Sequence, residues 1–289
     1  MGEVYRARHA QSGQVRAVKL LTRRAGQRER QQFDKEARFG ERLRHPNTVC
    51  ADDHGETWDQ TPWFAMDLVD GVSLEALVEQ EGAQSPRRVV ALLLQVAAAL
   101  AEVHAQGFVH RDIKPSNILL CRRPEGHECA KLLDFGLIKD LSEPDPSSSN
   151  DCVVGTPLYI APEALTAPDL VDGRTDLYGL GAVAHFLLCG APVFAGKGLV
   201  DVCAKHLFTP PEPLSNIVGG VSRELERVVL DCLAKDPAAR PAGARELSRR
   251  LRGCPEHEAV ASPCSRRTLS AHVSARCGTA ARGTPTCTW

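Results

Sequence analysis

The segment His110-Arg111-Asp112-Ile113-Lys114-Pro115-Ser116-Asn117 follows an apolar run with helical periodicity and precedes the strand-like segment Ile118-Leu119-Leu120. Within six residues of this loop stand a carboxylate, an ammonium group and a carboxamide, on Asp112, Lys114 and Asn117. These groups suit the binding of Mg²⁺ and of a phosphate, because phosphoryl transfer depends mostly on positioning and on electrostatic stabilisation of the transferred group. The loop therefore predicts a phosphoryl-transfer site.

The same loop matches the catalytic-loop pattern H-R-D-L-x-x-x-N, with Ile113 in place of the leucine. In this respect the chain resembles the protein kinase family, and Lys114 followed by Pro115-Ser116-Asn117 resembles its serine/threonine branch, in particular the bacterial eukaryotic-type kinases. The resemblance covers about residues 2 to 252, with several motifs in the order of the family. It implies an α+β, bilobal protein-kinase-like fold with a small β-rich N-lobe and a larger, mainly helical C-lobe. We expect the N-lobe over residues 1–66, a hinge over 67–71 and the C-lobe over 72–253.

Composition limits the function classes. The 289 residues are 43% hydrophobic, which is enough to form a substantial core. A formal net charge of -1 argues against nucleic acid or an anionic membrane as the main partner. The longest apolar stretch, from Val89 to Val103, is interrupted by Gln95 and Glu102, so we expect no membrane segment.

Cysteine usage points to a reducing compartment. The eleven cysteines are irregularly spaced and form no Cys-x-x-Cys pair, which indicates neither a disulfide framework nor a zinc ribbon. Cys121, His127 and Cys129 lack a fourth ligand in range for a zinc site. We expect reduced thiols and a cytoplasmic protein.

The first strands carry candidate nucleotide-binding residues. Residues 2–7 and 15–21 flank a turn with Gly13, which predicts a hairpin, and a period of two puts Ala17, Lys19 and Leu21 on one face. The resemblance implies that Ala17 lies over the adenine of ATP and that Lys19 holds its α- and β-phosphates. Without the surrounding motif, a single strand lysine would be interpreted as a solvated side chain.

A charged helix is expected over residues 28–43. The resemblance makes Glu36 the partner that holds Lys19, whereas a solvated glutamate is the alternative, because other glutamates lie nearby. Gly40 stands one turn later, where kinases usually carry an apolar residue. A glycine inside a helix costs roughly 1 kcal/mol relative to alanine. We therefore expect weak docking of this helix, with Phe39 compensating from the neighbouring position.

Two further segments complete the expected nucleotide site. Residues 61–69 resemble the strand that leads to the hinge, with Met66 as the gatekeeper and with the backbone from Asp67 to Val69 meeting adenine. Asp134-Phe135-Gly136 matches the D-F-G motif of the family. The resemblance implies that Asp134 and Asn117 hold Mg²⁺, that Asp112 accepts the proton of the attacking hydroxyl, and that Lys114 steadies the γ-phosphate.

The region between Gly136 and the Ala161-Pro162-Glu163 motif matches the activation segment in position. Autophosphorylation within residues 147–156 would place a phosphate where Arg111 could receive it, although the serines could equally form only a flexible linker. The loop at 155–159 resembles the one that seats a serine or threonine substrate. A protein with such a hydroxyl acceptor is thus the expected partner.

Other matches concern the scaffold and the chain ends. The resemblance makes Asp176 the residue that holds the catalytic-loop backbone, and Arg240 the partner of Glu163. Gly2 and Val4 match only the last part of the nucleotide loop G-x-G-x-x-G-x-V, so we expect the first strand of the N-lobe to be missing, weaker ATP binding and an unpaired sheet edge. Residues 254–289 have few large apolar side chains and are expected to be disordered.

Two functions are compatible with these motifs. The first is an ATP-dependent protein serine/threonine kinase with ATP and Mg²⁺ as its substrate and metal. The second is an inactive or weakened kinase fragment that acts as a protein-interaction module. The complete catalytic set favours the first.

Overall fold

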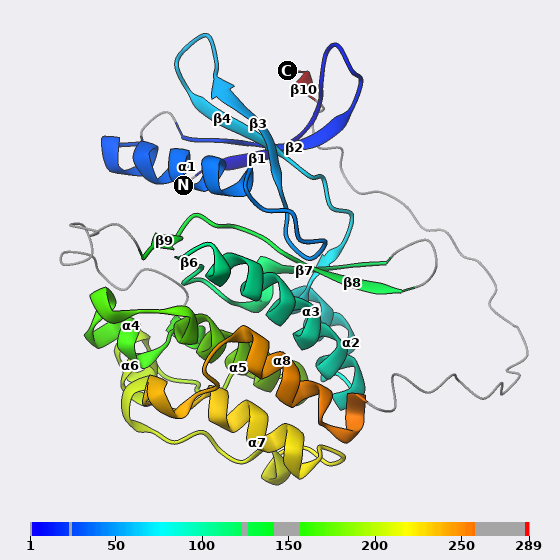
Figure 1. The fold of residues 1–289 in the computed structure, drawn as a ribbon, viewed down its shortest axis with the longest axis vertical. Coiled ribbons are helices and arrows are strands. Elements are labelled where there is room, and N and C mark those ends of the chain that lie inside the picture. Colours follow the sequence, from blue (N-terminus) through cyan, green and yellow to red (C-terminus); the bar gives the residue numbers. More distant parts are fainter. Residues whose placement is uncertain (1, 23–24, 123–126, 142–156, 258–286, 289) are drawn as a thin grey trace, which may run out of the picture.

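The computed structural model describes residues 2–22, 25–122, 127–141, 157–257 and 287–288. The described chain forms two lobes, a sheet-containing upper lobe and a larger helical lower lobe (Figure 1). Residues 67–71, between the lobes, belong to no helix or strand. This arrangement confirms the expected two-lobed α+β fold.

The upper lobe is built on a sheet of strand order β10-β1-β2-β4-β3. The strands are β1 (Glu3–Arg8), β2 (Val15–Leu20), β3 (Ala51–Glu56), β4 (Pro62–Met66) and β10 (Cys287–Thr288). Strands β1 and β2 form the expected hairpin, and Gly13 in its turn has the positive φ of 70° that glycine adopts most easily. Leu21, directly after β2, packs toward helix α1, whereas Val18 on β2 packs on the other face of the sheet.

The edge of this sheet differs from expectation. We predicted that the outer edge of β1 would be unpaired, but β10 pairs with it in parallel, Ala7 opposite Cys287 and Arg8 opposite Thr288. The pairing covers only the end of β1. Its outer backbone groups there find partners from the far end of the chain.

Helix α1 (Gln27–Gly40) packs against the sheet of the upper lobe. It begins where the Glu29 carboxylate accepts a hydrogen bond from the Gly26 N–H, and it buries Phe33, Glu36 and Phe39. The expected end at residue 43 was wrong: Gly40 is the last helical residue, so the cost of a glycine inside a helix does not apply. A Cβ on Gly40 would lie 2.9 Å from the Cβ of Ala51, so glycine allows the close approach of α1 to β3.

The lower lobe is centred on helix α3, which packs against α5 and α8. Ser85 caps its start by accepting a hydrogen bond from Arg88 N, with Pro86 at the first helical position, as the sequence predicts. The helices of this lobe are α2 (Leu74–Glu81), α3 (Pro86–Ala105), α4 (Pro162–Thr166), α5 (Gly173–Cys189), α6 (Leu199–Phe208), α7 (Arg223–Cys232) and α8 (Ala244–Arg252), with 3-10 turns at Pro115–Asn117, Pro157–Tyr159, Pro168–Leu170, Leu214–Asn216 and Pro237–Ala239.

Among the described residues, α3 is the one helix long and apolar enough to cross a bilayer by length and composition. Half of the apolar window is buried inside the protein, and Val89, Val96, Leu100 and Val103 belong to the main hydrophobic core. The core helix of a globular lobe has the same properties.

Short strands position the loops between the lobes. Strands β5 (Val72–Ser73), β7 (Ile118–Arg122) and β8 (Glu128–Leu132) form one sheet, and β6 (Phe108–Val109) pairs with β9 (Lys139–Asp140). The antiparallel strands β7 and β8 lie between the Asp112 loop and the Asp134 segment in the chain. Their pairing brings the ends of these segments close together.

The described chain remains packed beyond the expected end of the lower lobe. We predicted disorder from residue 254, but Cys254 is fully buried in the main core, and the Glu256 carboxylate accepts hydrogen bonds from Ser222. The boundary therefore lies after these residues. The prediction for 258–286 and 289 falls outside the described residues.

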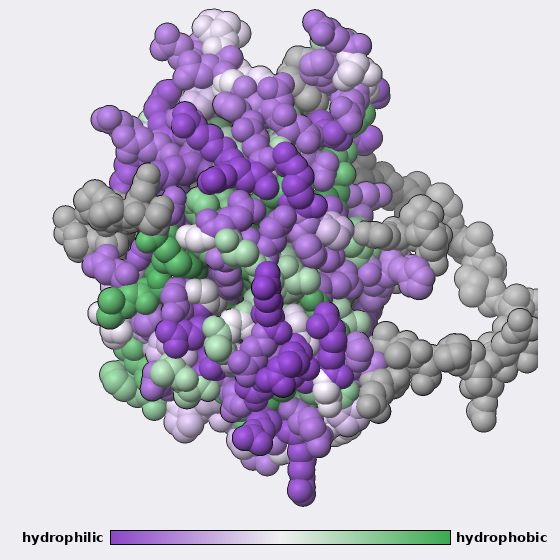
Figure 2. All heavy atoms as spheres, in the orientation of Figure 1, coloured by the Kyte–Doolittle hydropathy of each residue, from purple (hydrophilic) through white to green (hydrophobic). Residues whose placement is uncertain are grey.

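One part of the lower lobe exposes apolar side chains. Figure 2 shows hydrophobic residues gathered over the region of α4 and α6. On α6, Leu199, Val200 and Phe208 are exposed although their side chains are large and apolar.

Candidate active site

A cation and two carboxylates meet between the lobes. Lys19 Nζ, from β2, lies 2.6 Å from Glu36 Oε1 of α1 and 3.1 Å from Asp134 Oδ1. The side chains of Lys19 and Glu36 are largely buried, whereas that of Asp134 is 47% exposed. The solvated-glutamate alternative for Glu36 is therefore wrong.

Burial and charge act in opposite directions on these three groups. Burial alone would lower the pKa of Lys19, but Glu36 and Asp134 outweigh it and raise that pKa. Burial would likewise raise the pKa of Asp134, but Lys19 keeps it below its ordinary value, so this carboxylate is ionised. For Glu36 burial dominates over the attraction of Lys19 and raises the pKa to about 7.

The second group of polar side chains is the loop around Asp112. Lys114 Nζ lies 2.7 Å from Asp112 Oδ2, and Asn117 Nδ2 donates to both the backbone oxygen and Oδ2 of Asp112 at 2.9 Å. Asp112, Lys114 and Asn117 thus share direct contacts. The loop orders its carboxylate with two donors from its own residues.

Two hydrogen bonds to the backbone of Leu133 place these two groups side by side. The Leu133 N–H donates to the backbone oxygen of Asn117 at 2.9 Å, and His110 Nε2 lies 3.0 Å from the backbone oxygen of Leu133. Leu133 directly precedes Asp134. The Asp112 loop is therefore held against the segment that presents Asp134 to Lys19.

An aromatic contact connects helix α1 to the same region. The ring of Phe39 lies 5.3 Å from that of Phe135, whose other neighbour is His110 at 4.9 Å between ring centroids. Phe39 also packs on Phe108 at 4.4 Å. We expected Phe39 to compensate for the missing side chain of Gly40, and its contact with Phe135 confirms this.

The remaining nucleotide-site candidates lie along one face of the sheet. Val4 is opposite Lys19, and Ala17 is opposite Met66. Because Ala17 and Lys19 are two residues apart on β2, all four side chains lie on the same face of the sheet. Gly2 lies so close to the backbone of Leu20 that a Cβ would clash with its oxygen. Asp67 and Val69 follow β4, and the Asp67 N–H donates to the oxygen of Cys50.

Asp134 and Asn117 offer oxygen atoms suited to a hard cation. The Asp134 carboxylate is ionised and half exposed. Asn117 uses its amide nitrogen for Asp112, so the amide oxygen is the atom it can present to a metal. Carboxylate and carboxamide oxygens are ligands that Mg²⁺ accepts, and the residues therefore fit this ion.

A buried network below the site fixes the loop backbone. Asp176 on α5 accepts hydrogen bonds from the backbone N–H groups of His110 and Arg111, as predicted. His104 Nε2 lies 2.7 Å from the same carboxylate, a contact that the sequence analysis missed. The position of His104 in the last turn of α3 was the available signal, but it does not specify a partner.

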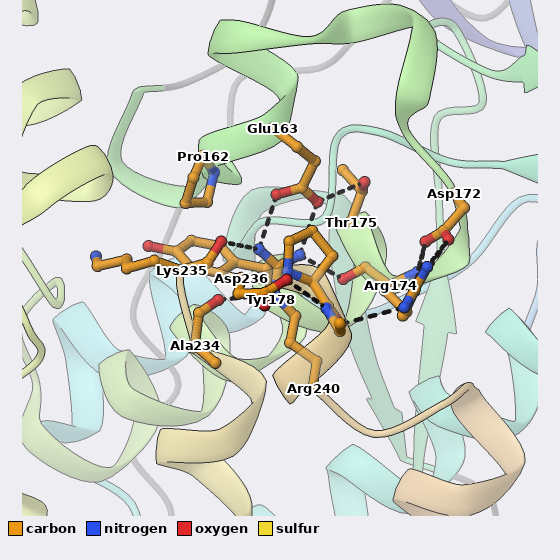
Figure 3. Close-up of polar contacts among 12 residues, drawn as sticks. Pro162, Glu163, Asp172, Arg174, Thr175, Tyr178, Ala234, Lys235, Asp236 and Arg240 are labelled. Carbon is orange, nitrogen blue, oxygen red and sulfur yellow. Dashed lines mark hydrogen bonds and ion pairs between the residues drawn. The ribbon is translucent and has the colours of Figure 1, made fainter.

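Glu163 and Arg240 form the predicted ion pair, with bonds of 2.7 Å to each carboxylate oxygen (Figure 3). Thr175 Oγ1 also donates to Glu163 at 2.7 Å. Thr175 was not predicted, because a helical threonine carries no signal of its own. Together these bonds tie α4, α5 and the segment before α8.

Arg111 has a φ of 65°, a left-handed conformation that is strained for a non-glycine residue. Its Nε donates to the oxygen of Leu137 at 2.6 Å, at the start of the predicted activation segment. The phosphorylation region 147–156 lies outside the described residues. Its predicted contact with Arg111 stays a prediction.

Comparison with known proteins gives a consistent result. The family model described as "Protein kinase domain" matches residues 1–250. The serine/threonine-protein kinase pkn3 of Myxococcus xanthus is 34% identical over 258 residues, covering 87% of this chain and 47% of that protein. The serine/threonine-protein kinase Pkn1 of the same organism is 40% identical over 242 residues, covering 83% and 34%.

A further relative comes from another group of bacteria. The serine/threonine-protein kinase PknH of Mycobacterium tuberculosis (strain ATCC 25618 / H37Rv) is 36% identical over 266 residues, covering 91% of this chain and 40% of that protein. The chain thus spans less than half the length of these relatives.

Proposed function

Because the chain belongs to the protein kinase family, in its bacterial-like serine/threonine branch, we propose that it transfers the γ-phosphate of ATP to serine or threonine hydroxyls of a protein. One observation carries this proposal. Lys19, Glu36 and Asp134 are in direct contact, and the hydrogen bond from Leu133 to Asn117 holds them beside the Asp112 loop. This arrangement brings a cation and carboxylates suited to bound phosphate and metal next to a carboxylate suited to accept a proton.

In the proposed reaction, the upper lobe holds the nucleotide. Lys19 neutralises the charge of the phosphates, and Glu36 fixes the position of its ammonium group through the 2.6 Å contact. Ala17, Val4 and Met66 line the sheet face on which adenine would lie, and the backbone from Asp67 to Val69 would bind its edge. Gly2 permits the start of β1 to come close to the backbone of Leu20 on β2.

The lower lobe supplies the groups at the transferred phosphate. Asp134 and Asn117 would hold Mg²⁺, which when bound neutralises charge on the phosphates. Asp112 orients the substrate hydroxyl and accepts its proton, since its carboxylate is ordered by Lys114 and Asn117. Lys114, beside Asp112, steadies the γ-phosphate as negative charge moves during transfer.

The acceptor class rests on two supports. The relatives that match this chain are described as serine/threonine kinases. Lys114 also lies beside Asp112, as the serine/threonine-type loop implies. We propose a protein substrate on these grounds.

A transfer assay with γ-labelled ATP, Mg²⁺ and a generic Ser/Thr protein substrate tests the proposal. Label should appear with the natural sequence and disappear in Asp112→Ala and in Lys19→Met. Lys197→Met is the matched control, because Lys197 is exposed and lies in the lower lobe away from Lys19. Folding of each variant is checked by circular dichroism.

The opposite result is equally informative. Absence of label in a folded, nucleotide-binding protein would overturn the enzymatic function and favour an interaction module. Label that persists in Asp112→Ala would show that another group accepts the proton.

A further inference from the structure

Two cysteines face each other on the hairpin that joins the Asp112 loop to Asp134. Cys121 on β7 is directly opposite Cys129 on β8 in the antiparallel register. Opposite residues point to the same face of a sheet and have Cα atoms roughly 4.5–5.5 Å apart. Disulfides span Cα separations of about 4.4–6.8 Å. The backbone of this hairpin therefore already has a spacing suited to a disulfide.

The surroundings of the two sulfur atoms hold them near this geometry. The Cys121 thiol donates to the backbone oxygen of Cys129 at 3.1 Å, so its sulfur lies over the opposite residue. Asn47 Nδ2 donates to the Cys129 sulfur at 3.6 Å and to the Ala130 oxygen at 2.7 Å. The Cys129 side chain is thus held by Asn47, whose amide also bonds to Gln95 on α3.

The two thiols differ in access to solvent. Cys121 is partly exposed, whereas Cys129 is 3% exposed. A dissolved oxidant therefore reaches Cys121 first. Cys129 is placed to react with the oxidised Cys121 side chain rather than with the oxidant.

We propose that Cys121 and Cys129 form a reversible disulfide when the folded protein meets a hydroperoxide. The Cys121 thiolate attacks one peroxide oxygen, the O–O bond breaks, and Cys121 becomes a sulfenic acid while the other oxygen leaves as water or an alcohol. The Cys129 thiol then attacks this sulfur, the S–O bond breaks, water leaves and the S–S bond forms. The two thiols lose two electrons and two protons, and the peroxide accepts them.

The reaction is expected to be slow compared with that of an activated cysteine. Burial and the neighbouring Cys129 raise the pKa of the Cys121 thiol, so the thiolate is a minor species at neutral pH. Geometry rather than thiol activation makes this pair specific. Once Cys121 is oxidised, the nearest thiol is that of Cys129.

The cross-link would lie close to the proposed metal-binding residues. Strand β7 begins directly after Asn117, and β8 ends at Leu132, two residues before Asp134. A disulfide would fix the two strands of this hairpin to each other. We expect the hairpin to resist protease and hydrogen exchange more strongly in the oxidised protein than in the reduced one.

Peptide mapping tests the proposal on the full chain. The folded protein is treated with hydrogen peroxide, remaining thiols are blocked by alkylation, and the protein is digested with trypsin. Cleavage after Arg122 separates Cys121, in peptide 112–122, from Cys129, in peptide 123–131. We expect these peptides as a linked pair with a mass two hydrogens below their sum, and its loss after treatment with dithiothreitol.

Variants and an unfolded sample define the controls. The linked pair should be absent in Cys121→Ser and Cys129→Ser and retained in Cys203→Ser, whose thiol is partly exposed on α6. Oxidation in urea should give a mixture of cysteine pairs instead. The proposal is overturned if folded natural protein yields Cys121 as sulfinic acid, linked to another cysteine, or still alkylatable after prolonged treatment; this readout needs no variant to fold.

Discussion

Arg240 donates through both terminal nitrogens to the two carboxylate oxygens of Glu163, at 2.7 Å each, although these residues are far apart in the chain. The side chain of Arg240 is 0% exposed and that of Glu163 10%. Bringing two charges out of water costs several kcal/mol per ion, and the pair offsets this cost only while both partners are present. The lower lobe therefore depends on the pair remaining complete.

Arg240→Ala should lower the free energy of unfolding by about 3–5 kcal/mol, because it leaves the Glu163 carboxylate buried without its cation. Urea unfolding followed by circular dichroism measures the change. Arg227→Ala is the matched control: its pair with Asp231 is 4.0 Å long and the Arg227 side chain is 82% exposed. That variant should change stability by less than about 0.5 kcal/mol. Equal effects of the two substitutions would refute the role of burial.

Gly40→Ala should destabilise the protein, because Gly40 ends α1 at a close approach to β3 and gains little from the helix preference of alanine there. The new methyl group would lie 2.9 Å from the Cβ of Ala51 and would push α1 away from β3. Overpacking of this kind costs about 1–3 kcal/mol. We expect a lower melting temperature in Gly40→Ala than in the natural protein.

The double variant Gly40→Ala, Ala51→Gly separates crowding from helix propensity. Removing the Ala51 methyl group gives the new one room, so the double variant should recover part of the stability that Gly40→Ala loses. If the double variant loses as much stability as Gly40→Ala and Ala51→Gly lose together, steric crowding is not the cause.

The sequence predicted which polar side chains meet between the lobes better than it predicted the details of packing. Asp112, Lys114, Asn117, Lys19, Glu36 and Asp134 were found because each stands in a local motif whose order is informative. Their contacts follow from the fold that those motifs imply. The end of α1 was missed because no strong stop signal stands after Gly40, and helix-forming residues continue beyond it.

Contacts between distant segments had weaker signals. Nothing in the composition of residues 254–257 indicated that Cys254 would enter the core, since burial there depends on the packing of α8. The pairing of β10 with β1 joins the two ends of the chain, and no local pattern specifies such a pair. His104 and Thr175 are ordinary helix residues until the fold brings Asp176 and Glu163 to them.

The stability of the protein should carry a pH dependence from Glu36. Burial raises the pKa of this carboxyl group from 4.5 to about 7, so between these values the folded protein keeps a proton that the unfolded chain releases. The contribution of Glu36 to the free energy of unfolding is therefore largest below pH 4.5 and falls as the pH rises through 7, by about 3 kcal/mol in total.

Glu36→Gln removes this titration while keeping the shape of the side chain. Urea unfolding of both proteins at several pH values between 4.5 and 8 should show the natural protein losing stability relative to the variant as the pH rises. Curves that run parallel across this range would show that Glu36 has the same pKa in the folded and unfolded chains.

Asp112→Asn should reduce the rate of phosphoryl transfer by about 10²- to 10⁴-fold, because an amide cannot accept the proton of the attacking hydroxyl. The substitution is nearly isosteric, and the amide oxygen can still accept from Asn117, which donates to Asp112 at 2.9 Å in the natural protein. Folding and nucleotide affinity should therefore change little, so the loss should appear in kcat rather than in the KM for ATP. Steady-state assays at varied ATP, with exposed Asp53→Asn as the control, measure both parameters. A variant that loses ATP affinity while keeping its kcat would place Asp112 in nucleotide binding instead of proton transfer.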